Sequence, residues 1–440
     1  MNHSSSAYEV IASHNKDVQV RLYTPAHQGM VHDGASLHGD IYQYDVPFLT
    51  RSRTQDVETY FSQFYGTKHT FWLTGGGTQG VLTACALLGS HGRVAIALNS
   101  HISTINGIIL TGLEPYFIPS QSLMPTTEEV IAALEASGVS ALLLTHPSYE
   151  GVTIDLVQVA DYCRQHDIAL AVDEAHGSHF PFLDDQWPSA IATPADIVTH
   201  SMHKYTGSLV QTALLHLPTG SRFTVEQVMG VLTLFEATTR SNLLILSIED
   251  AIKRGFSEEG RHQFWQATWE CDRLRSQLDG YGTVLTYDSQ VSDPLKIVLK
   301  SDRVSGTELA ELLYERGIDG EFADEEGVLL ICSFNHTQNN FQFMRKVFAE
   351  LALSLKQKAI DDVYSRTYFS RCPQITLSPQ DAFFKPKEKR PLHQSIGRIS
   401  GCCIKKVPPG SPLLIPGEKV TDWHLKHLSA DIIVEVVRED

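Results

Sequence analysis

The chain has 440 residues, of which 42% are hydrophobic and 20% are charged, and its formal net charge is −16 at pH 7. This length allows two or three folding units with a sizeable core. The acidic balance argues against non-specific nucleic-acid binding, which needs a basic surface, and is compatible with a cationic small-molecule substrate.

The first 50 residues carry no signal for secretion. The opening MNHSSSAYEV is polar and lacks the apolar core of a signal peptide. No apolar run in the chain approaches the ~20 residues that a membrane span needs. The seven cysteines are scattered and odd in number, which is not typical of a disulfide framework. We therefore expect a cytoplasmic protein without a membrane partner, with an irregular N-terminal segment over 1–50.

From about residue 51, short apolar runs alternate with amphipathic stretches such as 127–137 and 154–166. This alternation is typical of a mainly parallel sheet with helices on both faces. We predict an α/β domain over 51–282, ending in a long helical connector at 245–280. The runs expected to form buried strands are 93–99, 114–119, 141–147, 168–176 and 196–204.

The pattern of predicted helices and strands changes after DGYG at 279–282. The runs PLKIVLK and GVLLICSF, with a helical pattern over 306–316 between them, predict a smaller α+β domain. The segment 356–440 is rich in proline turns, such as VPPGSPLLIPGEKV. We expect it to complete this second domain, which then spans 283–440.

The stretch LTGGGTQG at 73–80 is a candidate anion site. Its glycines, ending in Gly77, lead through Thr78 and Gln79 into a helix. A glycine-rich turn at a helix start exposes backbone N–H groups to an anion, and Thr78 adds a hydroxyl. The stretch matches neither the Walker pattern nor GxGxxG. A tight turn without a ligand is the alternative interpretation.

Three chemically active side chains each follow an apolar run: His101 in NSHIST, Asp173 in AVDEAH and Lys204 in HSMHKYTG. Functional side chains of open α/β sheets gather at the carboxyl ends of strands, so we expect these three at one edge. The glycine-rich turn joins them if it follows a strand through FWLT. The alternatives are a helix N-cap for Asp173, a surface lysine for Lys204 and a turn residue for His101.

Together these groups match the needs of one cofactor, pyridoxal 5′-phosphate. Its phosphate needs donors at a helix start, and its protonated ring nitrogen needs a carboxylate. Its aldehyde needs a lysine for a Schiff base, and its ring face needs an aromatic or imidazole ring.

The sequence also resembles a known family. The motifs LTGGGTQGV, HPSYEGVTIDL, VDEAHGSHF, SMHKYTGSLVQTALLHL and DPLKIVL, with TPAHQG before them and PPGSPLLIPGE after them, resemble the bacterial Orn/Lys/Arg decarboxylases. The resemblance spans about 20–425 in the same order, and is closest to the short members without an N-terminal wing domain. It implies fold type I, the aspartate-aminotransferase fold: a mainly parallel α/β large domain that binds pyridoxal phosphate, and a smaller α+β C-terminal domain.

The resemblance also implies roles for individual residues. It makes Lys204 the Schiff-base lysine, Asp173 the partner of the ring nitrogen and His101 the stacking ring, and it puts His176 near the ring face or on the side of the 3′-oxygen. It implies a homodimer in which EATTRSN, at 236–242, reaches the neighbour's phosphate. The residues that cradle the phosphate by this resemblance are Gly77, Thr78, Gln79, Ser201 and His203.

The predicted reaction is decarboxylation of arginine, lysine or ornithine to an amine and CO2. The substrate amine displaces Lys204, and His176 or Lys204 returns a proton to Cα as a general acid. Glu321, Asp324 and Glu418 are candidate partners for the substrate's distal cation. Arg240 departs from the family pattern and is a candidate partner for an acidic group.

Three other functions stay open from sequence alone. If Arg398 clamps the substrate carboxylate in the ring plane, transamination or elimination and cyclisation of an arginine-like amino acid gains support. The spacings HGSH at 176–179 and HSMH at 200–203 fit a metal-dependent hydrolase, although such a site has no use for Lys204 and we assign no metal. A non-catalytic regulator that keeps the fold is the third, and the presence of Lys204 argues against it.

Overall fold

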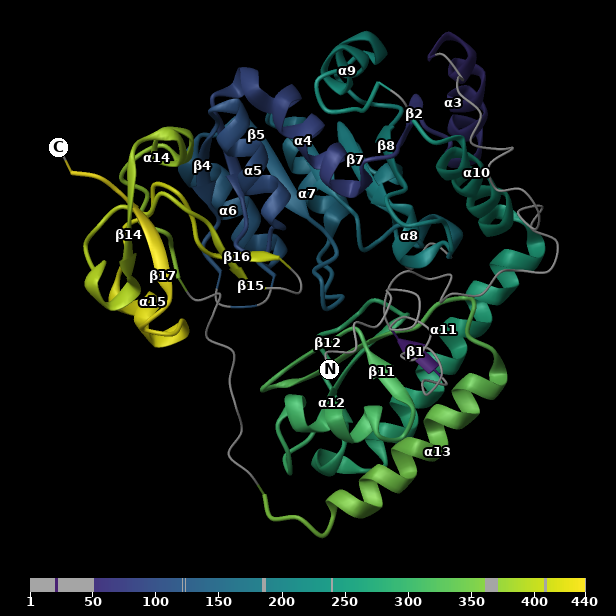
Figure 1. The fold of residues 1–440 in the computed structure, drawn as a ribbon. Helices are drawn as coiled ribbons and strands as arrows, with labels where there is room; N and C mark the ends of the chain where they lie inside the picture. Colours follow the sequence, from purple (N-terminus) through teal and green to yellow (C-terminus); the bar gives the residue numbers. More distant parts are fainter. Residues whose placement is uncertain are drawn as a thin grey trace, which may run out of the picture.

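A computed structural model describes residues 20–22, 51–120, 122, 124–183, 187–238, 240–360, 371–406 and 410–439. Figure 1 shows a central sheet with its helices, a second sheet with two long helices below it, and a C-terminal unit, in yellow, at the left of the central sheet. The N-terminal prediction over 1–50 lies outside the described residues except for β1 (Val20–Leu22), which pairs in parallel with β11 (Ile318–Gly320).

The central sheet has seven strands in the order β2-β8-β7-β6-β5-β3-β4. Strands β4, β3, β5, β6 and β7 are parallel to one another, and β8 runs antiparallel to both of its neighbours, β7 and β2. The strands are β2 (His69–Leu73), β3 (Arg93–Ile96), β4 (Glu114–Phe117), β5 (Ala141–Thr145), β6 (Ala169–Asp173), β7 (Ile197–Ser201) and β8 (Ala213–Leu217). Each of the five predicted apolar runs therefore contains a strand.

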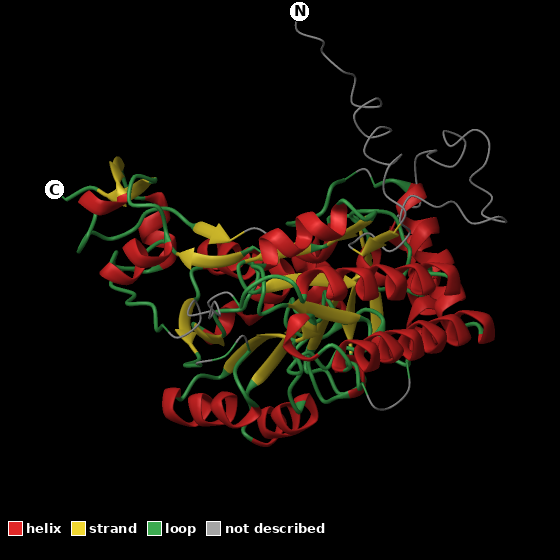
Figure 2. Cartoon of the chain, turned by 90° about the horizontal axis from the view of Figure 1, so that it is seen from below, coloured by secondary structure: helices red, strands yellow, loops and turns green. Residues whose placement is uncertain are grey.

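Helices cover both faces of this sheet, as Figure 2 shows from below. Strands β5 to β8 are buried at every position, and β5, β6 and β8 are mostly apolar, as expected for strands covered on both faces. Apolar clusters lie between the strands and the helices. The helices of this part are α3 (Arg51–Tyr65), α4 (Gly76–Leu88), α5 (Ile102–Thr111), α6 (Thr127–Ser137), α7 (Leu156–Gln165), α8 (Met202–Tyr205) and α9 (Val225–Leu232).

The predicted helical connector is two helices, α10 (Asn242–Phe256) and α11 (Glu258–Asp279). Ser257 separates them and caps α11, because its hydroxyl accepts a hydrogen bond from Gly260 N at 3.0 Å. The second helix packs against α13 (Gln338–Leu355) in the next unit. The chain thus leaves the central sheet along one helix and enters the second sheet along the other (Figure 1).

The second unit is a four-stranded sheet in the order β12-β13-β10-β9. Its ladders are antiparallel throughout, and its core is continuous with that of α11 and α13. Its elements are β9 (Thr286–Tyr287), β10 (Lys296–Lys300), α12 (Gly306–Tyr314), β12 (Phe322–Asp324) and β13 (Gly327–Ile331), followed by α13.

The C-terminal unit has an apolar cluster of its own, built around Leu392, Leu414 and Val436. It also packs on the central domain, where Gln380 Nε2 donates to Ile109 O in α5 at 3.0 Å and Ile415 enters the central apolar cluster. The boundaries 1–50, 51–282 and 283–440 stay predictions, since the described residues beyond 371 contact α5 as well as the second unit. The elements are α14 (Pro379–Phe384), β14 (Lys387–Pro391), β15 (Ile404–Lys406), β16 (Ser411–Leu414), α15 (Asp422–His427) and β17 (Ile433–Val437).

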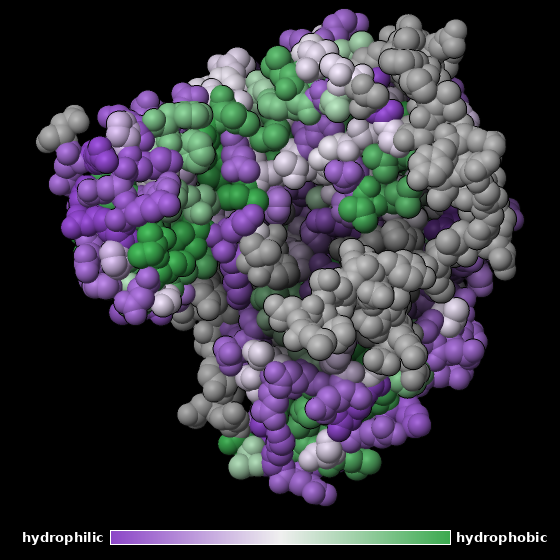
Figure 3. Space-filling view, viewed as in Figure 1, coloured by the Kyte–Doolittle hydropathy of each residue, from purple (hydrophilic) through white to green (hydrophobic). Residues whose placement is uncertain are grey.

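The described surface is mainly hydrophilic on the face in Figure 3, with smaller hydrophobic areas among the polar ones. In the part of the chain that the structure describes, no helix combines the length and apolar character needed to cross a bilayer.

Candidate active site

A cavity of about 310 Å³ opens at the edge of the central sheet. Eight residues that the sequence singled out line it: Gly77, Thr78, His101, Asp173, His176, Ser201, His203 and Lys204. Their convergence follows from the topology, because β6 ends at Asp173 and β7 ends at Ser201 in a parallel pair. Strand β2 points the same way as β7, since both are antiparallel to β8, so the glycine-rich turn reaches the same edge.

Helix α4 begins at this edge without a side-chain cap. Gly75 N donates to Gln79 Oε1 at 2.9 Å, and Gly76 N donates to Gln211 O at 2.8 Å, which holds the turn in place. The side chain of Gln79 therefore braces the turn and is absent from the cavity lining. Gly77 and Thr78, in the first turn of α4, line the cavity. This is the positive end of the helix dipole, where the free N–H groups of a first turn favour an anion.

Gly77 permits a close approach between α4 and β7. A Cβ atom at this position would lie 2.4 Å from Ser201 Oγ, closer than any such contact tolerates. The missing side chain thus lets the helix start and the serine hydroxyl line the same part of the cavity. His203 lies there too, with Nδ1 3.2 Å from Thr212 O.

Lys204 lies on α8, directly after β7, and its Nζ is 2.6 Å from His176 Nε2. Burial lowers the pKa of Lys204 to about 8, and the charge of nearby Lys296 lowers it further. The carboxylates of Asp173 and Glu321 act in the opposite direction and raise it. Such a lysine is a partly deprotonated amine at neutral pH and therefore a competent nucleophile.

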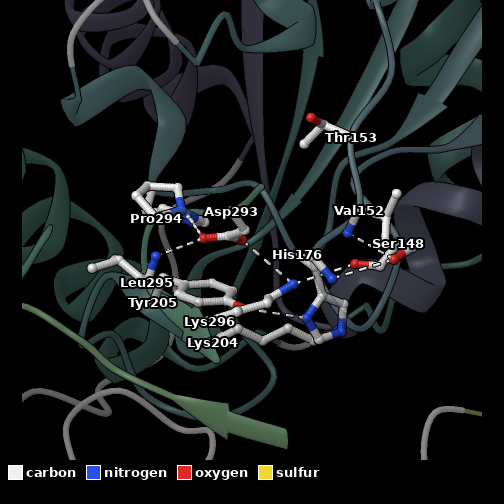
Figure 4. A network of polar contacts seen from close by, with 12 residues as sticks. Ser148, Val152, Thr153, His176, Lys204, Tyr205, Asp293, Pro294, Leu295 and Lys296 are labelled. Carbon is white, nitrogen blue, oxygen red and sulfur yellow. Dashed lines mark hydrogen bonds and ion pairs between the residues drawn. The ribbon is translucent and has the colours of Figure 1, made fainter. Parts of the chain in front are cut away.

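His176 lies between Lys204 and Tyr205 (Figure 4). Its Nδ1 is 3.4 Å from Tyr205 Oη, and its ring meets the Tyr149 ring edge-on with the centroids 5.0 Å apart. Burial lowers the pKa of His176 well below its usual value, and Lys204 and Lys296 lower it further. The imidazole is therefore neutral, and its Nε2 can accept a hydrogen bond from Lys204 Nζ.

Asp173 is a buried carboxylate that lines the cavity. Its Oδ1 accepts a hydrogen bond from Ala175 N at 3.2 Å. Burial raises the pKa of Asp173, while Lys204 and the Ala175 N–H lower it. A cationic group in the cavity would stabilise the charged form further.

His101 caps helix α5, and its ring lines the cavity. Its Nδ1 accepts a hydrogen bond from Ser103 N at 3.2 Å. Burial, with Lys204 and Lys405, lowers the pKa of His101 to about 4, so the ring is neutral at physiological pH. A neutral ring with Nδ1 as acceptor carries its proton on Nε2.

Glu321, Asp324 and Glu418 were the candidate partners for the substrate's distal cation. Within the described residues, Glu321 is the one whose side chain is hydrogen-bonded to a residue of the cavity lining. The Tyr149 hydroxyl, which belongs to the lining, donates to Glu321 Oε1 at 2.9 Å. Asp324 instead pairs with Lys406 at 2.9 Å. Glu418 is buried in the C-terminal unit, where it pairs with Arg371.

The two candidate arginines have partners outside the cavity lining. Arg240 stacks on the ring of Trp72, with Cζ 4.0 Å from the centroid. Arg398 lies in the C-terminal unit and pairs with Glu388 at 2.8 Å and Glu439 at 3.0 Å. In the structure, then, neither arginine reaches the wall of the cavity where a substrate carboxylate would lie.

Sequence reasoning missed a second group of charges beside the site. Lys296 has no exposed surface, and its Nζ is 3.5 Å from Asp293 Oδ2 and 3.3 Å from Ser148 O (Figure 4). Asp293 also contacts His179 Nε2 at 3.0 Å. Burial opposes the charge of Asp293, but His179 and Lys296 outweigh it and hold its pKa at about 2. The only signal was a lysine that interrupts the apolar run PLKIVLK.

The residues present fit pyridoxal 5′-phosphate. Both amide atoms of Asn99 and the hydroxyl of Thr145 belong to cavity residues, are buried, and have no hydrogen-bond partner among the described residues. Such atoms are expected to contact a bound molecule. An uncapped helix start suits its phosphate, Asp173 suits its protonated ring nitrogen, and the Lys204 amine suits its aldehyde.

Comparison with protein families decides the identity of the fold and enzyme class. Residues 49–285 match the model of the Orn/Lys/Arg decarboxylase major domain, which is more than half of the chain. The chain belongs to the Orn/Lys/Arg decarboxylase family. Two relatives that this decarboxylase resembles are the arginine decarboxylase of Halalkalibacterium halodurans, 29% identical over 85% of this chain and 80% of that protein, and the arginine decarboxylase of Bacillus subtilis, 26% identical over 97% and 93%.

Solved structures agree on the fold. Lysine decarboxylase A from Pseudomonas aeruginosa superposes with a TM-score of 0.73 at 16% identity, covering 88% of this decarboxylase and 72% of that chain. The Francisella novicida lysine decarboxylase LdcF gives 0.73 at 15% identity, covering 98% and 83%. The predicted fold type I architecture, the pyridoxal-phosphate cofactor and the decarboxylase class are thereby confirmed.

The metal-hydrolase alternative finds no support in the described residues. Its histidines have other partners, since His179 contacts Asp293 and His200 Nε2 is 2.6 Å from Glu174 Oε2. No group of three or more potential ligands able to hold a metal ion occurs in the described ranges.

Proposed function

We propose that this enzyme decarboxylates L-arginine, and that Lys204 holds the cofactor. The family makes the protein a decarboxylase of a basic amino acid. Four curated relatives named arginine decarboxylase match the chain at 26% identity or more, whereas the lysine decarboxylase LdcA of Pseudomonas aeruginosa matches at 21%, which supports arginine among the basic substrates. The observation that carries the assignment of the site is the Lys204 Nζ at 2.6 Å from the neutral His176, inside a cavity that Asp173 also lines.

We propose the following residues as holders of the cofactor. Lys204 anchors the aldehyde, Asp173 pairs with the ring nitrogen and His101 lies on the ring face. Gly77 and Thr78, with Ser201 and His203, hold the phosphate, and Gln79 acts indirectly by bracing the turn. When bound, pyridoxal phosphate supplies an electron sink for the electron pair that remains when the carboxylate leaves.

The chain's own residues move the protons. Lys204 must be a neutral amine to react, and its pKa near 8 makes that form accessible. His176 Nε2 is placed to hold Lys204 Nζ by a hydrogen bond and so to orient the amine, while Tyr205 and Tyr149 hold the imidazole ring in position. We propose that this pair also delivers the proton that replaces the carboxylate on Cα.

Glu321 is our candidate for recognition of the substrate's distal cation. It reaches the cavity wall through the Tyr149 hydroxyl, and its charge acts on Lys204. A carboxylate paired with a neutral phenol keeps acceptor capacity for a guanidinium. Arg398, by contrast, has its own carboxylates, which removes the support for transamination.

Homodimer formation and a cytoplasmic location are further parts of this proposal. Val210, 52% exposed, and Gln211 line the cavity, so a second subunit that covers them would help to close the site. All seven cysteines are free, which fits a reducing compartment. Light scattering of the holoenzyme tests the dimer, and cell fractionation tests the location.

The decisive assay measures CO2 release and amine products from arginine, lysine and ornithine, with and without added pyridoxal phosphate. We expect agmatine and CO2 from arginine at a higher kcat/KM than from the other two. A 2-oxo acid product without CO2 would instead indicate transamination, and a preference for lysine or ornithine would overturn the substrate assignment.

A further inference from the structure

A hairpin from the C-terminal unit reaches the candidate cofactor site. Strands β15 and β16 pair antiparallel, with Lys406 opposite Ser411. Gly410 O accepts a hydrogen bond from Ile102 N at 2.9 Å, at the start of α5. Lys406 Nζ pairs with Asp324 on the second sheet at 2.9 Å. The hairpin is therefore held by both the central domain and the second unit.

Gly410 lies against the edge of the His101 ring. Its φ of +97° is a conformation that favours glycine. A Cβ atom here would lie 2.9 Å from His101 Cδ2 and 3.0 Å from His101 Nε2. The ring is held on its other side by Ser103, so it has little room to give way.

Ser411, the next residue, lines the cavity and is 5% exposed. The hairpin therefore brings a polar group to the same cavity wall as the His101 ring.

We propose that this hairpin is part of the active site: Gly410 is a positioning residue that fixes the plane of the His101 ring, and Ser411 supplies a hydroxyl to the bound cofactor or substrate. The inference rests on the proposed cofactor site and goes beyond it, because it assigns part of that site to the C-terminal unit. Because a Cβ atom at 410 would meet the edge of the ring, any larger side chain there displaces the ring.

The test compares Gly410→Ala with Gly397→Ala in the full-length enzyme. Gly397 also has a positive φ, of +83°, but a Cβ atom there meets nothing within 4 Å, so its variant carries the backbone strain alone. We expect Gly410→Ala to bind pyridoxal phosphate about three- to tenfold more weakly, the loss of a ring-stacking contact, and to alter the circular dichroism of the bound cofactor. Equal affinities and spectra for the two variants would overturn the proposal.

Ser411→Ala separates the two possible contacts. A higher dissociation constant for pyridoxal phosphate assigns the hydroxyl to the cofactor, and a higher KM alone assigns it to the substrate. No change in either would show that Ser411 is not part of the site. Cofactor affinity is measurable even if wild-type enzyme releases no CO2 from arginine, so failure of the proposed substrate is distinguishable from failure of this inference.

Discussion

Lys204 and Lys296 lie near each other in Figure 4, yet they differ in their access to the cavity and in their polar partner. Lys296 has no exposed surface and has a carboxylate partner, Asp293, at 3.5 Å. Lys204 opens onto the cavity, and its nearest polar partner is the neutral imidazole of His176. Burial lowers the pKa of both lysines. At Lys296 the adjacent Asp293 opposes that shift and favours the charged, structural form, whereas Lys204 beside a neutral base can lose its proton and react.

The largest effect should come from removing the reactive amine. Lys204→Ala is expected to lower turnover by about 10³-fold or more, because no other amine lines the cavity among the described residues. The thermal unfolding temperature should stay near that of the wild-type apoenzyme. Retention of substantial activity with bound cofactor would contradict the assignment.

The opposite pattern is expected for the structural lysine. Lys296→Met should lower the free energy of unfolding by about 3–5 kcal/mol, because it removes the buried ammonium and leaves Asp293 with His179 alone. The matched control is Lys300→Met on the same strand, whose pair with Asp288 is partly exposed and should contribute about 1 kcal/mol or less. Denaturant unfolding measures both variants, and equal losses would remove the distinction between the two lysines.

A double variant sharpens this second prediction. Lys296→Met combined with Asp293→Asn should recover part of the lost stability, since no unpaired carboxylate remains. If the double variant is less stable than the sum of the two single variants, the ion pair is not the reason for the loss.

The pH dependence of the apoenzyme tests the pKa of Lys204. A lysine in the unfolded chain titrates near 10.5, whereas folding lowers the pKa of Lys204 to about 8. Between these values the unfolded state binds more protons, so raising the pH favours the folded state by up to about 3 kcal/mol. The difference in unfolding free energy between wild type and Lys204→Met should therefore change across this window and level off outside it. A constant difference would contradict the lowered pKa.

Asp173→Asn should have the smallest of these effects. We expect kcat to fall by roughly 10²-fold, because the amide no longer stabilises a protonated ring nitrogen. Stability of the apoenzyme should not fall, since burial already disfavours the Asp173 carboxylate. Steady-state kinetics and thermal unfolding check the two halves, and an unchanged kcat would remove Asp173 from the site.

Sequence alone predicted the groups that lie at strand ends. Asp173 and Lys204 were found because each follows an apolar run, and parallel strands bring their carboxyl ends together. Lys296 was missed because its place inside a strand says nothing about the carboxylate and carbonyl that the fold supplies. Tyr149 was missed for a similar reason, since its contact with His176 depends on how two loops meet.

The contacts of the C-terminal unit could not be predicted from sequence patterns. Its proline-rich turns predict irregular structure, but nothing in them indicates that Gly410 lies against His101, more than 300 residues earlier in the sequence. The same holds for Arg398, whose neighbours Glu388 and Glu439 are brought together by pairing of β14 with β17. Long-range placement of this kind follows from packing, which periodicity does not encode.

The most direct measurement is borohydride reduction of the holoenzyme followed by peptide mass spectrometry. The reduction fixes the link between the cofactor and its lysine, so the modified peptide identifies the amine. A pyridoxyl group on Lys204 alone is the predicted result. A label on Lys296 or another lysine, with Lys204 unmodified, would contradict the account.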